Sequence, residues 1–281
     1  VVPRQVRCGG VGASGHQALF MVSEDPNAID CDARWRPEGV APAPVTDDYP
    51  FAYLAERGIP GFYLATIGLI LLMSLVLVRV TSGPIRRMRR YIDLFFMGAA
   101  FLLLTTKNVV QFALLFGTTW FVNALVFAGV LLTVLAAIEV ARRFEIRRVR
   151  LLWGLLFVSL AVAWAVPVSW LLSLPMGLRF VSAVAIAFAP VFLANLIFSR
   201  RFRGVGSSTI AFGANLLGSM VGGVLEYGAL ILGYRALLVV AAVFYALAFV
   251  FGRWPIGGSA PARAAGAQVP TDTGGGAPAE A

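Results

Sequence analysis

The residues of this sequence that could do chemistry are polar and charged side chains inside long apolar stretches. Residues 99–117 read AAFLLLTTKNVVQFALLFG, with Lys107, Asn108 and Gln111 near the middle, and Lys107 is the only lysine of the chain. Gln111 follows Lys107 by four residues, so both lie on one face of a helix. A charge in mid-membrane costs roughly 2.5–3.5 kcal/mol. We therefore predict that this face is turned toward the protein interior and that Lys107 has a partner there.

A second stripe of polar and small residues runs through TIAFGANLLGSMVGGVLEYGALIL (209–232). Spacings of four, three and four place its members on one helical face. The Gly218-x-x-x-Gly222 spacing lets a neighbouring backbone approach closely, but packing does not explain a carboxylate in the same stripe. The stripe consists of Asn215, Ser219, Gly222 and Glu226, and a second small-xxx-small spacing adds Gly223.

Lys107 and Glu226 are expected at a similar depth. They lie about 15 and about 17 residues from the same end of two helices that run in the same direction. Since buried charges in lipid usually pair with one another, we predict that the two side chains face each other, with Gln111, Asn215 and Ser219 around them. A binding site for a small polar or amphipathic molecule is one interpretation, and a purely structural ion pair is the other.

The elements that must position these residues are membrane-spanning helices. The 281 residues are 59% hydrophobic and 13% charged, with a mean hydropathy of +0.83, which is too apolar for a soluble domain. A spanning helix needs about 20 apolar residues, and uniform stretches of this length exclude barrel strands. We predict an all-α polytopic membrane protein with about seven transmembrane helices. They are predicted at 60–80, 91–116, 119–141, 151–172, 178–198, 209–232 and 236–252.

The arginines predict the orientation of these helices. They cluster at 79–90, 142–150 and 199–206, whereas the alternate loops carry almost no charge. Under the positive-inside rule the three basic loops and the C-terminus are cytoplasmic, and the N-terminal segment is outside a bacterial-type plasma membrane. Topology and anionic lipid explain the net charge of +9. We therefore expect the lipid bilayer as a partner, and no nucleic acid.

Three regions follow from the change in composition along the chain. Residues 1–58 form a short extramembrane segment, in which 16–23 reads as one strand and 1–8 as another. Residues 59–254 form the transmembrane domain. Residues 255–281 are rich in Pro, Gly and Ala, which predicts a disordered tail.

The extramembrane segment offers little chemistry of its own. A G-x-G-x-x-G spacing at 10–15 precedes a strand-like run, whereas a dinucleotide site needs a helix there. It is interpreted as a glycine-rich connection between strands, and His16 as a polar strand residue. Cys8 and Cys31 are predicted outside, where a disulfide is one interpretation and two unpaired thiols the other. No spacing of Cys and His residues indicates a metal site.

Three stretches taken together resemble one family. They are TDDYPFAYLAERGIPGFYL (46–64), DLFFMGAAFLLLTTKNVVQFALLFGTTWFVNALV (93–126) and GANLLGSMVGGVLEYGALILGYRALL (213–238). They resemble the junction and membrane helices of membrane-bound spermidine synthase-like proteins. In that group an aminopropyltransferase-like or methyltransferase-like Rossmann domain is fused to membrane helices. The resemblance implies that residues 1–58 are a remnant of such a domain, and that a Rossmann-like enzyme domain or subunit is a partner.

The sequence thus favours an integral membrane module of a spermidine synthase-like protein. We expect no catalytic residues, no cofactor and no independent catalysis, because no cofactor-binding core is present in the sequence. The polar residues would hold a small polar or amphipathic ligand. Two alternatives stay open: a small-molecule or proton-coupled transporter that uses Lys107 and Glu226, and a structural membrane anchor. The oligomeric state is left open as well.

Overall fold

The computed structural model describes residues 4–8, 19–23, 46, 48–50, 58–59, 61–83, 85–144 and 148–253. They belong to two units, residues 1–45 and 46–281, each of which is described by itself. In the first unit, β1 (Arg4–Cys8) and β2 (Leu19–Ser23) pair antiparallel. Both strands lie within the stretches that the sequence predicts as strands. The G-x-G-x-x-G spacing therefore stands between two strands and is followed by β2 instead of the helix that a dinucleotide site needs.

From Gly61 on, the described part of the second unit is helical apart from its short connections. Six of its stretches are long and apolar enough to cross a membrane, and the chain is an all-α polytopic membrane protein. Its elements are α1 (Gly61–Ser82), the 3-10 helix η1 (Ile85–Tyr91), α2 (Ile92–Phe116), α3 (Trp120–Arg143), α4 (Val149–Ala165), α5 (Val168–Leu172), α6 (Met176–Arg203), α7 (Ser208–Leu225), the 3-10 turn η2 (Glu226–Gly228), α8 (Ala229–Leu232) and α9 (Tyr234–Arg253).

The predicted span at 151–172 differs from the structure, because it is divided into α4 and α5. Pro167 separates the two helices in an extended conformation. Proline donates no backbone N–H and disfavours the helical region for the residue before it, so α4 ends just before it. At 1.5 Å per residue, the 17 residues of α4 extend about 25 Å. This is less than the roughly 30 Å of a bilayer core, so the described residues hold six long spans and one shorter apolar helix.

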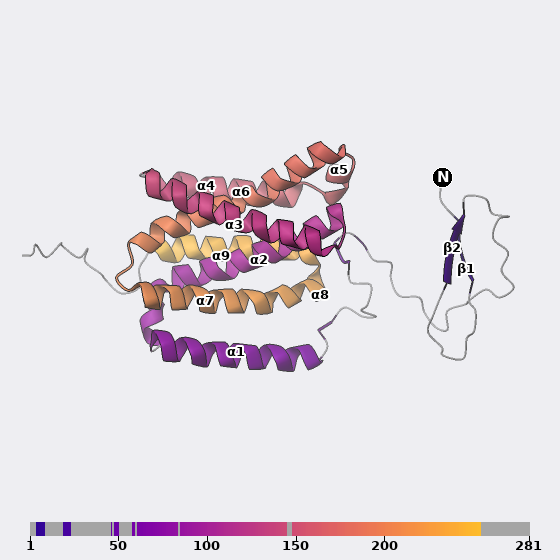
Figure 1. The fold of residues 1–281 in the computed structure, drawn as a ribbon. Coiled ribbons are helices and arrows are strands. Elements are labelled where there is room, and N and C mark those ends of the chain that lie inside the picture. The colour runs from indigo at the N-terminus through magenta and orange to yellow at the C-terminus, as the bar shows by residue number, and fades with distance from the viewer. Residues whose placement is uncertain are drawn as a thin grey trace, which may run out of the picture. The chain divides into compact units, whose positions relative to one another are not determined.

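The helices are stacked in layers (Figure 1). α1 lies at one edge and packs against α7, and α7 packs against α2. α2 and α9 form the next layer, and α3, α4 and α6 cover its other side. α2 therefore has neighbours on several sides, including α3, α6, α7 and α9.

Large apolar side chains cover the outside of the bundle. Phe62 and Val80 of α1 are 80% and 77% exposed, and Leu131 of α3 is 68% exposed. A soluble monomer does not present apolar surface continuously along whole helices, whereas hydrocarbon lipid solvates it. The exposure pattern therefore agrees with a bilayer around these helices.

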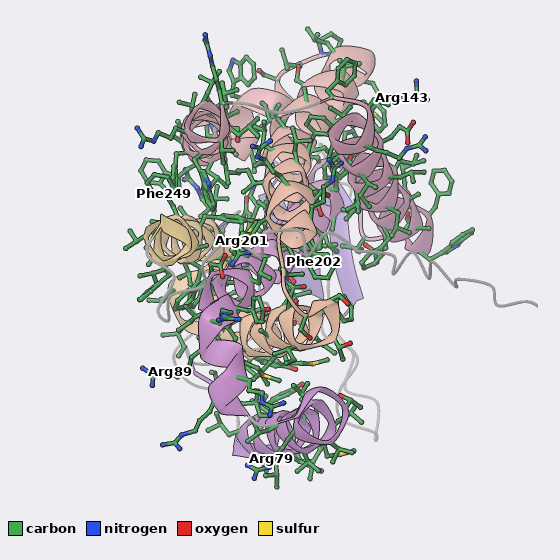
Figure 2. All side chains as sticks on the ribbon, turned by 90° about the vertical axis from the view of Figure 1, so that its left-hand side faces the viewer. Arg79, Arg89, Arg143, Arg201, Phe202 and Phe249 are labelled. Atoms are coloured by element: carbon green, nitrogen blue, oxygen red, sulfur yellow. The ribbon has the colours of Figure 1, made fainter. Side chains whose placement is uncertain are left out.

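The three arginine clusters meet at one end of the bundle, called here the arginine end. Figure 2 looks onto this end, where Arg79, Arg89, Arg143 and Arg201 are labelled. Two of the clusters are more regular than predicted: much of 79–90 is the 3-10 helix η1, and Arg200 to Arg203 form the last turn of α6. Cationic side chains in a last helical turn are favoured by the helix dipole.

Candidate functional site

Helix α2 carries the buried polar groups of the bundle. Of the side chains that the structure describes, the buried polar or charged ones all belong to this helix. They owe their burial to the central position of α2, because α7, α9, α3 and α6 surround it. They are Asp93, Thr105, Lys107, Asn108 and Gln111.

Lys107 is a buried cation without a carboxylate partner among the described residues. Its side chain is 3% exposed, and its Nζ donates a hydrogen bond to Oε1 of Gln111, one helical turn on. The expected proximity of these two residues is therefore present. Both line a cavity of about 10 Å³, together with Trp164 and Arg235 among others. A cavity of this size has room for about one water molecule.

Arg235 stands in the first turn of α9 and lines the same cavity as Lys107. Its Nη2 donates to the carbonyl oxygen of Trp164 at 2.7 Å, and its guanidinium carbon lies 5.7 Å from the centre of the Trp164 ring. Arg235 thus covers the C-terminal end of α4, where a cation is favourable. Two cationic side chains, Lys107 and Arg235, therefore face one small space.

The segment around Asp48 attaches to the same end of α9. The carbonyl oxygen of Asp48 accepts from the backbone N–H of Tyr234 at 3.0 Å, and its Oδ1 accepts from that of Arg235 at 3.1 Å. The hydroxyl of Tyr49 donates to the carbonyl oxygen of Leu230 at 2.9 Å. Asp48 thereby satisfies two free N–H groups at the start of α9 and fixes the first turn, which carries Arg235.

The predicted contact between Lys107 and Glu226 is not formed. Oε2 of Glu226 accepts a hydrogen bond from the hydroxyl of Thr106 at 2.7 Å, whereas Lys107 turns to Gln111. Thr106 precedes Lys107 directly, so the predicted depth agrees with the structure and the predicted direction does not. Successive helical residues point about 100° apart, so Thr106 is directed toward Glu226 of η2 and Lys107 toward the cavity that Arg235 of α9 also lines.

Asn215 and Ser219 hold α7 to the backbone of α2 and do not surround Lys107. Nδ2 of Asn215 donates to the carbonyl oxygen of Leu94 at 3.0 Å, and Oγ of Ser219 approaches that of Gly98 at 3.3 Å. Both contacts lie more than one helical turn closer to the arginine end than Lys107. Their polar groups are used between helices, as is typical of membrane bundles.

Glycines bring these two helices into backbone contact. A Cβ at Gly218 would overlap the carbonyl oxygen of Phe95, and one at Gly222 would lie 2.6 Å from that of Ala99. A Cβ at Gly223 would lie 3.1 Å from the Leu102 side chain. These glycines thus stand at a contact with α2, where the sequence predicts packing.

Asn108 faces a third neighbour, α6. Its Nδ2 donates to the carbonyl oxygen of Ala187 at 3.0 Å, and the side chain is fully buried. Its Oδ1 has no hydrogen-bond partner in the described part of the chain. Asn108 therefore links α2 to α6 and does not contribute to the Lys107 cavity.

The residues predicted to form one site around Lys107 are not all together in the structure, and other residues lie near Lys107. It keeps Lys107 with Gln111, and it separates both from Glu226. The sequence-based prediction missed Arg235, Trp164 and the contact of Thr106. Arg235 had a usable signal, because it is a single arginine in an otherwise nearly uncharged loop. Its position in the lining of the Lys107 cavity, however, depends on the packing of α9 against α2.

Two predictions lie outside the described residues. Cys31 is one of them, so the disulfide with Cys8 stays a prediction, and the tail 255–281 is the other. In the described ranges no group of three His, Cys, Asp or Glu side chains could hold a metal ion.

No family model, curated protein or solved structure matches the chain. The resemblance to spermidine synthase-like proteins therefore stays a prediction.

Proposed function

We propose that the chain is the membrane module of a spermidine synthase-like protein, and that it binds the acidic group of a small molecule at Lys107. The observation that supports this most directly is Lys107 itself, which is 3% exposed and hydrogen-bonded to the neutral Gln111. An uncompensated buried charge is costly. A bound acidic group would offset that cost.

The charge around Lys107 sets the chemical class of the ligand. Arg235 lines the same cavity, so the local field is positive. It favours a carboxylate or another small anion and disfavours a polyamine, whose ammonium groups would be repelled. Spermidine itself is therefore not the expected occupant of this site.

Access to Lys107 depends on the residues of the end opposite the arginine end. The cavity has room for about one water molecule, so an acidic group larger than water must displace a lining residue. Trp164 is 52% exposed in the last turn of α4, which ends at Ala165, two residues before Pro167. We propose that movement of Trp164 and Arg235 opens the site toward the outside, since the arginine end is proposed to be cytoplasmic.

The test is the thermal stability of the purified chain in nanodiscs with acetate, glutamate, phosphate or spermidine. An acidic probe is expected to raise the unfolding temperature, because it binds the folded state only. Lys107→Met should abolish the rise. Thr105→Val should keep it, because the Thr105 hydroxyl bonds within its own helix to Phe101 and does not line the cavity. An equal rise in Lys107→Met, or no rise with any acidic probe, would refute the proposal.

A transporter is the second candidate, and the helix at Glu226 favours it. The regular α-helix stops at Leu225, and Glu226 opens one 3-10 turn inside the apolar span Ser208–Leu232. Interrupted helices often carry ion or substrate sites in transporters. Proteoliposomes test this directly: proton or substrate flux that is lost in Glu226→Gln would support transport. If liposomes with the wild-type protein show no flux, transport is excluded, and a binding module and a structural anchor remain as the candidate functions.

A further inference from the structure

We propose that a cavity at the arginine end, between α2, α4, α6 and α9, binds the headgroup phosphate of an anionic phospholipid. The cavity has a volume of about 520 Å³, which is in the range of small-molecule sites. It is separate from the Lys107 cavity, with which it shares no lining residue. Lipid binding at this cavity therefore does not depend on ligand binding at Lys107.

A partly buried ion pair forms one wall of this cavity. Nε of Arg201 donates to Oδ2 of Asp93 at 2.5 Å, and Nη2 lies 3.5 Å from Oδ1. The Asp93 side chain is 5% exposed and that of Arg201 30% exposed. Asp93 therefore neutralises Arg201 and fixes the orientation of its guanidinium, so that its outer N–H groups stay free for a ligand.

Two further arginines leave this cavity with a positive charge. Arg150 comes from α4 and Arg200 from α6, and neither has a hydrogen bond or ion pair with any other residue that the structure describes. Guanidinium groups bind phosphate oxygens through paired N–H donors. Once the pair of Arg201 and Asp93 is counted as neutral, two cations face one cavity, which suits one phosphate group.

The remaining wall is apolar and suits an acyl chain. It includes Met97, Trp153, Ile197 and Phe249. Figure 2 views this end, with Arg201 of α6 and Phe249 of α9 labelled. The cavity thus combines a cationic part at the end of the helices with an apolar part between them. Basic pockets of this kind, between helices on the cytoplasmic side, are typical of anionic-lipid sites.

A second arginine-lined cavity provides an internal comparison. It has a volume of about 540 Å³, and its arginines come from η1 and are exposed. Its apolar lining is limited to Tyr91 and Ile210. It offers charge with little wall for an acyl chain, so it serves as the control for charge alone. Its arginines are Arg86, Arg87, Arg89 and Arg90.

The experiment measures lipid retained by the full chain. The purified protein in detergent is titrated with phosphatidylglycerol or phosphatidylcholine, and bound lipid is counted by native mass spectrometry. Phosphatidylglycerol should bind preferentially, and Arg150→Gln with Arg200→Gln should weaken it about 30-fold, from about 1 kcal/mol for each arginine. Arg86→Gln with Arg87→Gln removes the same charge from the same end and should change the affinity less than threefold.

Three results would overturn the proposal. Equal loss in the two double variants would mean that charge alone attracts the lipid. Equal retention of phosphatidylcholine would exclude recognition of the anionic headgroup. If millimolar inorganic phosphate displaced phosphatidylglycerol and stabilised the protein as much as the lipid does, the cavity would be assigned to a soluble phosphate. Because all four substituted arginines are partly or fully exposed, both variants are expected to fold, and circular dichroism checks this.

Discussion

The ion pairs near the arginine end differ in burial and should differ in their contribution to stability. The pair of Asp93 with Arg201 is largely buried, whereas Glu139 contacts Arg142 and Arg143 at the surface. We expect Asp93→Asn to reduce the free energy of unfolding by about 1–3 kcal/mol, because it leaves a partly buried arginine unpaired. Glu139→Gln should change the free energy of unfolding little, because this carboxylate and its two arginine partners are exposed to solvent. Thermal unfolding in detergent compares the two, and equal losses would contradict the structure.

Lys107 and Glu226 should behave independently. Each bonds a different neighbour, Gln111 and Thr106 respectively. The effects of Lys107→Met and Glu226→Gln on unfolding free energy should therefore add within about 0.5 kcal/mol. Lys107→Met and Gln111→Leu, by contrast, should be non-additive by about 1 kcal/mol, because those side chains share a hydrogen bond. Strong coupling between Lys107 and Glu226 would restore the ion pair that the sequence suggested.

Some contacts of the candidate site could be predicted from the sequence, and others could not. Counting residues from the helix ends predicted that Glu226 is level with the turn of α2 that carries Thr106 and Lys107, because depth depends only on the helical rise. The count could not choose between Thr106 and Lys107, because the rotation of α2 about its axis is set by its packing against α7 and α9. Gln111 was predictable as a neighbour of Lys107 from its i+4 spacing alone.

At the scale of elements, the contact between α2 and α7 depends on glycine. A methyl group at Gly218 would overlap the backbone of Phe95, whereas Gly154 on α4 has open space around its Cβ position. Gly218→Ala should lower the free energy of unfolding by about 1–3 kcal/mol or more, because the helices must separate. Gly154→Ala should be neutral or stabilising by about 0.5–1 kcal/mol. Equal unfolding temperatures for the two variants would contradict the close packing.

The helices themselves were largely predictable, and their interruptions were not. Hydropathy located the long spans because a bilayer demands long apolar helices. It also joined α4 and α5 into one span, although Pro167 was visible in the sequence. Proline is tolerated in some membrane helices, as Pro190 within α6 shows. Whether a proline ends a helix depends on neighbours that satisfy the freed carbonyl groups, and these come from tertiary packing.

For the whole molecule, the arrangement predicts which end faces the cytoplasm. The arginine clusters meet at one end (Figure 2), and the positive-inside rule predicts that this end is cytoplasmic. In a chain with Cys8→Ser and Cys31→Ser, Thr118→Cys at the turn between α2 and α3 should react with an impermeant thiol reagent on intact cells. Gly204→Cys, in the turn between α6 and α7, should react only after lysis.

Both positions are exposed in the structure. A position that does not react on intact cells is therefore shielded by the membrane and not by the protein. In the unmodified chain, Cys8 and Cys31 should be labelled on intact cells after mild reduction. The reverse pattern in the two introduced cysteines would show that the protein has the opposite orientation in the membrane, with the opening to Lys107 on the cytoplasmic side.

The proposed binding of an acidic group at Lys107 can be measured directly, because of the composition of the chain. Lys107 is the only lysine, so protein made with lysine labelled with carbon-13 at Cε gives a single lysine signal by NMR. Titration of the full chain in nanodiscs with acetate should shift this signal in a saturable manner, while spermidine chloride at equal ionic strength should not. A lysine signal that no acidic probe moves, or that spermidine moves equally, would show that Lys107 is not a binding site for acidic groups.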